Sequence, residues 1–204
     1  MTVPLFSVSH TVIYNLFLFC GGYAPQGKEL RMAKEVKEKK ETKEEMFKVF
    51  GEFDSAKEIN MTAEGLLNEG DINNLYVLAE ENGLDKEDVD DFIDGMGEFC
   101  TVFSAAVGKL NIEKKYADKE IKLILDTIVS MAMTLCRDDD VAAAVRRKGK
   151  NTKEIIESMK KAAGKHKTGS MGVCCGTDKQ LIAVIRAYYL KGKEEMVKVI
   201  DSLY

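Results

Sequence analysis

The stretch FCTVFSAAVGKLNIEKKYADKEIKLILDTIVSMAMTL, residues 99–135, decides the fold that we expect for this chain. Its apolar residues recur at intervals of three and four, which is the spacing of one face of an α-helix. The second half carries the longer stripe, from Ile121 to Leu135, behind a predicted N-cap at Asp118. We therefore predict two core helices here, the first with the inward residues Phe99, Val102, Phe103, Ala106, Val107 and Leu110.

Shorter helical patterns with their own start and stop signals lie on both sides of this stretch. The predicted helix starts are Ser55, Asp71, Asp85, Asp138, Thr152 and Thr177, the last in a capping box with Gln180. The predicted stops are Gly70, Gly83, Gly149 and Gly164. Because the stops come at short intervals and no strand pattern is convincing, we predict an all-α fold. The expected form is a compact orthogonal bundle of about eight or nine short-to-medium helices.

The length of 204 residues indicates one domain, and an apolar content of 45% is enough to build its core. We divide the chain into an apolar N-terminal segment 1–31, a Lys- and Glu-rich tail 32–45 and a helical domain 46–204. Within that domain we distinguish an acidic half 52–101, the core helices 98–136 and a basic half 141–204.

The apolar N-terminal segment admits more than one interpretation. It lacks the positive start of a secretory signal, and its flanks are poor for a membrane span, although its length would suffice. We favour a translated leader. Codons for Lys28 and Glu29 can form a ribosome-binding sequence just before Met32, which would then be the natural start. The N-terminus is therefore predicted to be a leader or a disordered tail.

The charges of the domain are strongly segregated along the chain. Residues 52–101 contain 15 Asp and Glu against 2 Lys, whereas residues 141–204 contain 14 Lys and Arg against 6 Asp and Glu. The formal net charge of −4 hides this asymmetry. Such a distribution bears on partners rather than on fold. We therefore predict one acidic and one basic surface, with self-association through opposite charges as an alternative.

The candidate partner-binding residues of the acidic half are Asp88, Asp90, Asp91 and Asp94, on the outward face of a short helix. A calcium loop that starts at Asp90 fails, because Phe92 falls where an oxygen ligand is needed and Thr101 falls where a bidentate Glu is needed. Two interpretations remain. The face is either simply solvated, or it imitates a phosphate backbone and binds a basic protein groove.

The candidate nucleic-acid-binding residues of the basic half are Arg146, Arg147, Lys148, Lys150, Lys160, Lys161, Lys165 and Lys167. Cations are also favourable at a helix end for reasons of the helix dipole alone, and that interpretation stays open. The gap between Gly164 and Thr177 is too long for a helix-turn-helix. Any nucleic-acid binding should therefore be sequence-tolerant contact with phosphates.

No motif in the chain has the spacing of a catalytic or metal site. The segment Gly169–Gly172 has the GXXG form of a KH module, but the strands of that module are missing. Cys174 and Cys175 lie near His166 but lack the spacing of zinc ligands. We predict no catalytic residue, no metal and no cofactor, and we favour an enzyme least. The five cysteines form no disulfide framework, so we predict free thiols and a location in the reducing cytoplasm.

Four runs of the sequence resemble small acidic proteins encoded on mobile elements of gut Firmicutes. They are FGEFDSAKEI (50–59), AEGLLNEGD (63–71), LAEENGLDKEDVDDFIDG (78–95) and AVRRKGK (144–150), and the resemblance extends from Phe50 to Tyr189. Similar small accessory proteins include inhibitors of type II CRISPR effector nucleases. The resemblance implies a setting, and no functional residue of that family is carried onto this chain.

Together these observations give a leading hypothesis and two alternatives. The leading one is a non-enzymatic inhibitor or accessory protein of a mobile element, an anti-CRISPR that binds a type II effector nuclease. Such a nuclease holds its heteroduplex in a basic channel that the acidic face could occupy, with DNA or RNA held alongside by the basic segment. The first alternative is a nucleic-acid-binding regulator or maintenance protein that uses residues 146–167. The second is a small structural or toxin-neutralising partner, and a membrane partner is disfavoured.

Overall fold

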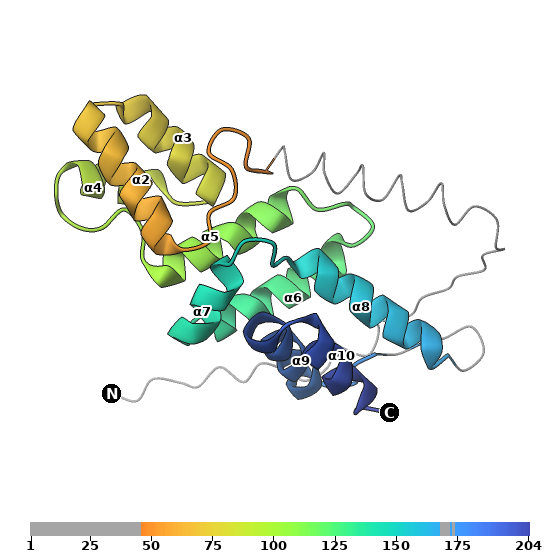
Figure 1. The fold of residues 1–204 in the computed structure, drawn as a ribbon. Coiled ribbons are helices and arrows are strands. Elements are labelled where there is room, and N and C mark those ends of the chain that lie inside the picture. The colour runs from red at the N-terminus through yellow and green to blue at the C-terminus, as the bar shows by residue number, and fades with distance from the viewer. Residues whose placement is uncertain (1–45, 168–171, 173) are drawn as a thin grey trace, which may run out of the picture.

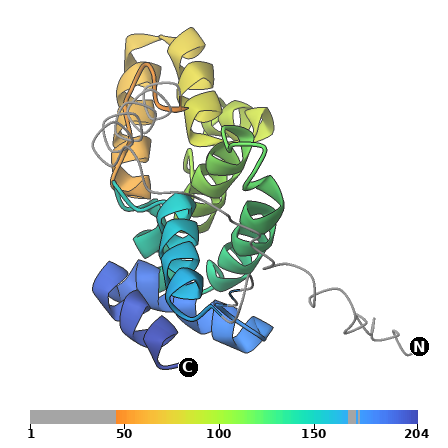
Figure 2. The same cartoon turned by 90° about the vertical axis from the view of Figure 1, so that its right-hand side faces the viewer.

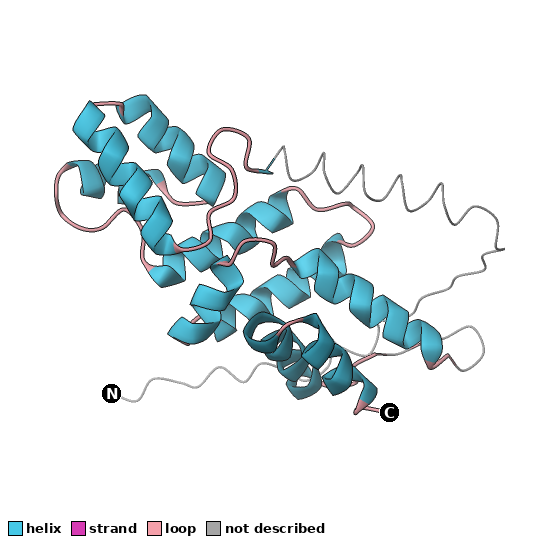
Figure 3. Ribbon diagram, viewed as in Figure 1, coloured by secondary structure: helices cyan, strands magenta, loops and turns pink. Residues whose placement is uncertain are grey.

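The computed structural model describes residues 46–167, 172 and 174–204, and these residues form nine α-helices and no strand (Figures 1 and 3). The predicted all-α class is confirmed. The predicted leader, the charged tail and Gly169 lie outside the described residues. In chain order the helices are α2 (Ala56–Glu69), α3 (Ile72–Asn82), α4 (Lys86–Ile93), α5 (Val102–Lys115), α6 (Lys122–Leu135), α7 (Asp139–Arg146), α8 (Thr152–Lys165), α9 (Asp178–Lys191) and α10 (Lys193–Asp201).

Most of the helix boundaries follow from local capping. The Ser55 side chain accepts a hydrogen bond from the Glu58 amide, and the Asp71 side chain accepts one from the Asn74 amide. Gly83 ends α3 in the left-handed region, at φ +66°, where a side chain would be strained. The capping box of Thr177 with Gln180 is also present, at the start of α9. These predicted boundaries are confirmed.

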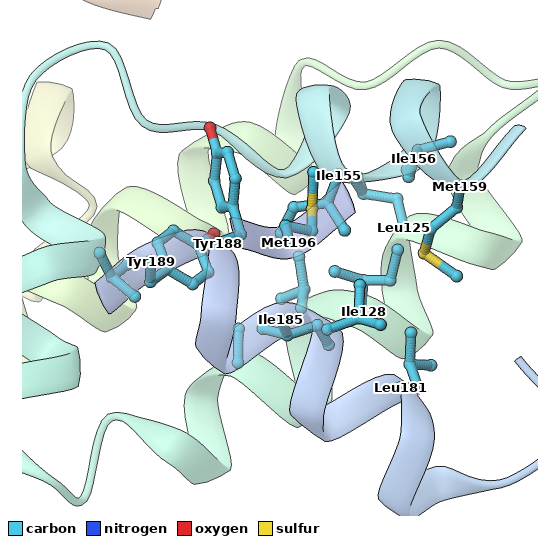
Figure 4. Packing of buried hydrophobic residues seen from close by; sticks show 14 of the residues in the cluster. Leu125, Ile128, Ile155, Ile156, Met159, Leu181, Ile185, Tyr188, Tyr189 and Met196 are labelled. Carbon is cyan, nitrogen blue, oxygen red and sulfur yellow. The ribbon is translucent and has the colours of Figure 1, made fainter. Parts of the chain in front are cut away.

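The helices enclose two hydrophobic clusters. A first cluster gathers α2, α3, α4 and the beginning of α5, and includes the edge-to-face pair Phe92–Phe99. A second cluster gathers α6 to α10 with the rest of α5, and Figure 4 shows Leu125, Ile185 and Tyr189 among its members. In Figures 1 and 2 the helices of the first cluster lie at one end of the molecule, and α9 and α10 lie at the other.

Helix α5 lies between the two clusters and contributes side chains to both (Figure 1). The predicted inward stripe of α5 is therefore wrong in part. A capping box of Thr101 with Ser104 starts the helix after Phe99, and Val102 and Phe103 face solvent at 39% and 46% exposure. The core is instead contacted on two sides by small residues, Ala105 in the first cluster and Ala106 in the second.

The C-terminal end of α3 approaches α5 backbone to backbone. A Cβ at Gly108 would lie only 2.1 Å from the Asn82 carbonyl oxygen, and one at Gly83 would lie 2.4 Å from the Gly108 carbonyl oxygen. Only a residue without a side chain fits at either place. This contact holds the first cluster against the centre of α5, and it directs the Asn82 side chain toward α7.

Two predicted N-caps have other roles. Helix α8 is capped by Asn151, whose side chain accepts a hydrogen bond from the Glu154 amide, and Thr152 is its first residue. Helix α6 begins at Lys122, and Asp118 belongs to the preceding turn, where its carbonyl accepts from the Ile121 amide at 3.1 Å. Both predictions took the Ser, Thr, Asp or Asn nearest to the apolar stripe, whereas the N-cap lies one residue earlier before α8 and three residues later before α6.

Candidate functional site

The short helix α4 and the loop that follows it carry an exposed acidic face. Between residues 85 and 98 the chain has seven carboxylates and one lysine, and all eight side chains are exposed. The amphipathic pattern produces this arrangement, because Val89 and Phe92 are buried in the first cluster and the polar residues must point outward. The predicted partner-binding residues Asp88, Asp90, Asp91 and Asp94 all lie on this face, which we call the α4 surface (residues 85–98).

The carboxylates of the α4 surface are not neutralised within the described residues. No Lys or Arg described in the structure forms an ion pair with them, and the polar contacts are a hydrogen bond from the Tyr76 hydroxyl to Asp90 and one from Asn60 to Glu98. Other acids of the same half do have cationic partners. Glu52 pairs with Lys109 at 2.9 Å, and Glu80 lies 3.9 Å from Lys115. Among the described residues, the α4 surface therefore keeps its negative charge facing solvent.

Apolar side chains are exposed on and beside the α4 surface. Met96 lies within it and is 69% exposed. Asn60 of α2 binds the Cys100 backbone on both sides, accepting from its amide at 2.8 Å and donating to its carbonyl at 2.9 Å. This contact brings α2 to the end of the loop, where the neighbouring residues Met61 and Phe103 are also exposed. Sequence reasoning assigned Phe103 to the core and did not single out Met61 or Met96, because an isolated methionine carries no signal of its exposure.

Arg146 is part of the core, so its predicted place in a nucleic-acid interface is wrong. Its side chain is fully buried at the end of α7, where Nη2 donates to the Asn82 side-chain oxygen at 2.6 Å and the guanidinium lies 5.9 Å from the Phe47 ring centre. Burial lowers the pKa of Arg146 from its usual value. A phosphate cannot reach this guanidinium in the folded protein.

Lys150 is also turned inward. Its Nζ donates to the Tyr188 carbonyl at 2.7 Å and lies 4.5 Å from the centre of the Tyr188 ring. Burial lowers the pKa of Lys150 from its usual value. This lysine joins the α7–α8 loop to the end of α9, so its amine is committed to a contact within the protein.

The other six predicted basic residues are exposed, but they do not form one continuous patch. Arg147 and Lys148 lie in the loop before α8, where the backbone of 148–149 donates to the acidic side chains of Glu52 and Asp54. Lys160, Lys161, Lys165 and Lys167 lie at the other end of α8. A helix of 14 residues is about 21 Å long, so the two groups are far apart. The end of α8 is the part of the basic half that retains a surface of lysines.

A buried polar junction joins the two clusters at α5. Lys109 is buried, and its Nζ pairs with Glu52 at 2.9 Å and donates to the Arg147 carbonyl at 2.7 Å. Burial lowers the pKa of Lys109, while the nearby carboxylates of Glu113 and Glu52 act in the opposite direction. Sequence reasoning missed this junction, because a lysine on an apolar helical face gives no signal of its burial.

Glu113 continues the polar junction toward α8. Its Oε2 accepts from the Thr152 amide at 2.8 Å and from the Thr152 hydroxyl at 2.6 Å. Burial raises the pKa of Glu113 above its usual value, although Lys109 and the Thr152 hydrogen bonds lower it. Next to it, the Tyr188 hydroxyl donates to Glu154 at 2.7 Å, and Glu154 pairs with Lys193 at 2.7 Å. This network fixes α8 against α5, α9 and α10.

A cavity of about 250 Å³ opens beside this network. Its wall is mostly apolar, with Tyr116, Ile121 and Leu125 among the lining residues, and Glu113 and Glu154 contribute carboxylates. Its two other charged residues, Asp118 and Lys153, pair with each other at 3.1 Å, and Lys193 pairs with Glu154 at 2.7 Å. The lining residues include no Ser, Cys or His, so neither a serine or cysteine nucleophile nor a histidine base lies in the described wall.

Comparisons with known proteins add no relative to these observations. No protein-family model, no curated protein and no solved structure matches the chain. Within the described ranges, no three His, Cys, Asp or Glu side chains are grouped to hold a metal ion. None of the helices in that part of the chain has both the length and the apolar character needed to cross a bilayer.

Proposed function

We propose that this chain is a non-enzymatic binding protein that uses the α4 surface to dock onto a basic groove of a protein partner. The observation that carries the proposal is the acidic face of α4, with seven exposed carboxylates in 14 residues and no ion pair to a described Lys or Arg. A partner of opposite potential is attracted to such a face from a distance, and like-charged surfaces are rejected. The exposed Met96 offers an apolar anchor within the charged surface, which is the arrangement that interfaces use.

The partner class that we propose is a type II CRISPR effector nuclease. Such an enzyme holds a guide–target heteroduplex in a positively charged channel, which an acidic surface of a small protein can occupy in place of the nucleic acid. The resemblance of residues 50–189 to small acidic proteins of mobile elements implies a setting in which inhibitors of such nucleases are also encoded. The chain would then act as an inhibitor by occupying the channel, and it would need no catalytic residue.

The direct test compares two charge-reversed variants of the full chain in a nuclease assay. In the first, Asp88, Asp90, Asp91 and Asp94 are changed to Lys. In the matched control, the exposed acids Glu64, Glu69, Glu120 and Asp201 are changed to Lys, so that the change in net charge is the same. We expect the unmodified chain and the control to bind the nuclease and inhibit DNA cleavage, and the α4 variant to lose both effects.

Inhibition that persists in the α4 variant, with unchanged helix content by circular dichroism, would refute the proposal. Equal loss in both variants would also refute it, because net charge rather than the α4 surface would then be responsible. An unmodified chain that neither binds nor inhibits type II effectors would remove the nuclease as the partner.

A second candidate function is sequence-tolerant nucleic-acid binding by the exposed lysines at the end of α8. Lys161 and Lys165 lie one helical turn apart on its outward face, and Lys167 follows the helix. Changing these three to Ala should weaken any gel shift, and the shift should weaken steeply with salt. Absence of a shift at low salt would exclude this candidate.

A further inference from the structure

Two adjacent cysteines are buried together near the C-terminus of the chain. Cys174 and Cys175 lie between α8 and α9, at 3% and 9% exposure, and both are free thiols in the second cluster. Their sulfur atoms are 3.9 Å apart, with the Cys175 thiol donating to the Cys174 sulfur. The other described cysteines, Cys100 and Cys136, are also buried, but neither lies beside a second described thiol, and Cys100 donates to the Ala56 carbonyl instead.

The surrounding chain fixes the position of this pair on both sides. Before it, Gly172 packs so tightly on α8 that a Cβ there would lie 2.2 Å from the Ala163 carbonyl oxygen. After it, the Gly176 amide donates to the Gln180 side chain at 2.8 Å, next to the capping box that starts α9. These contacts anchor the described backbone close to both cysteines.

The C-terminal residue completes the environment of Cys174. The Tyr204 ring stacks on His166 at the end of α8, with centres 3.7 Å apart. Hydrogen bonds from Cys175 and from the Tyr204 hydroxyl lower the pKa of the Cys174 thiol, although burial acts in the opposite direction. In contrast, burial raises the pKa of Cys100 to about 12 and that of Cys136 to about 11. Thiolates are the nucleophilic form, so Cys174 has the more reactive sulfur.

We infer that Cys174 and Cys175 form a peroxide-sensitive dithiol site, in which Cys174 is the attacking residue and Cys175 resolves the product. The Cys174 thiolate attacks one oxygen of a hydroperoxide, the O–O bond breaks, and a sulfenic acid and one water or alcohol are formed. The Cys175 sulfur then attacks the Cys174 sulfur, the S–O bond breaks and a second water leaves. Two thiols lose two electrons and two protons in total, and the peroxide accepts them.

The oxidation is expected to be reversible, because the disulfide between Cys174 and Cys175 should be easily reduced. Sulfur atoms in a disulfide are about 2.05 Å apart, so the pair must close by about 1.9 Å, through side-chain rotation together with a local change of the 174–175 backbone. Neighbouring Cα atoms are about 3.8 Å apart, which is shorter than the usual separation across a disulfide. A bond formed under such constraint is readily reduced by external thiols.

The test uses the full folded chain and its own cysteines as controls. After treatment with hydrogen peroxide, free thiols are alkylated, and trypsin separates the three sites into peptides 168–179, 87–109 and 123–137. We expect peptide 168–179 to lose the mass of two hydrogen atoms and to escape alkylation, while Cys100 and Cys136 remain alkylated. Dithiothreitol should restore both thiols of peptide 168–179.

Variants separate the two roles. In Cys175→Ser, Cys174 should form a sulfenic acid that a dimedone reagent captures, and the loss of two hydrogens should disappear. In Cys174→Ser, Cys175 should remain alkylated after the same treatment. Oxidation of Cys100 or Cys136 as fast as the pair, or a stable sulfenic acid at Cys174 beside a free Cys175 in the unmodified chain, would overturn the inference. A pair that stays fully reduced would overturn it as well.

Discussion

Replacing Arg146 by Ala tests whether this residue is part of the core or part of a binding surface. The change removes the 2.6 Å hydrogen bond to Asn82 and leaves the Asn82 oxygen buried without its donor. A hydrogen bond to a charged group contributes about 1.5–3 kcal/mol. The stem of the side chain and its contact with Phe47 add to the loss, because packing on an aromatic ring is also removed.

A part of the stability lost in Arg146→Ala is offset. Within the described residues, Nε and Nη1 of Arg146 are buried without a hydrogen-bond partner, so their removal relieves a desolvation cost. We expect a net destabilisation of about 3 kcal/mol, which lies within the range for breaking a buried charged pair. With a urea m-value of about 2 kcal/mol/M, the midpoint of unfolding should fall by about 1.5 M.

The assay is urea unfolding followed by circular dichroism, which suits an all-helical chain without tryptophan. The matched control is Arg147→Ala at the next position, where the side chain is exposed and the loss should stay within about 0.5 kcal/mol. Arg146→Met keeps most of the apolar stem, so its urea midpoint should lie between those of Arg146→Ala and Arg147→Ala. If Arg146→Ala and Arg147→Ala unfold at the same urea concentration, the placement of Arg146 in the core is wrong.

Two further predictions concern α5, one its close contact with α3 and the other the buried Glu113. Gly108→Ala should destabilise the protein by about 1–3 kcal/mol, because the new Cβ would lie 2.1 Å from a backbone oxygen, whereas Gly65→Ala on the open face of α2 should stabilise it by up to about 1 kcal/mol. If Gly108→Ala and Gly65→Ala change the thermal unfolding temperature equally, the close approach of α3 and α5 is contradicted. The pKa of Glu113 is raised in the folded state, so the folded protein binds more protons and stability should fall as pH rises from about 4.5 through the raised pKa. Glu113→Gln should flatten this part of the stability–pH curve, and an unchanged slope would exclude Glu113 as its source.

The helices could be predicted from the sequence because their boundaries depend on neighbouring residues. A serine or aspartate before an apolar stripe and a glycine after it specify the ends of α2 and α3 without any tertiary contact. The outward direction of the α4 carboxylates followed from the same logic, since Val89 and Phe92 occupy the inward face.

The burial of charged residues could not be predicted, because it depends on contacts between distant segments. Arg146 lies in a run of basic residues, and only the approach of Asn82, 64 positions earlier, shows that it is part of the core. Lys109 is likewise buried by Glu52 and by the α7–α8 loop. The inward stripe of α5 failed for a related reason, since this helix contacts two clusters rather than one.

Hydrogen exchange of the complex between this chain and a guide-loaded type II effector nuclease tests the central claim most directly. If the α4 surface is the docking site, amides between residues 85 and 98 should exchange more slowly in the complex, while those at the end of α8 should be unchanged. Protection confined to α8, or none on either element in a complex that forms, would contradict the assignment of binding to the α4 surface.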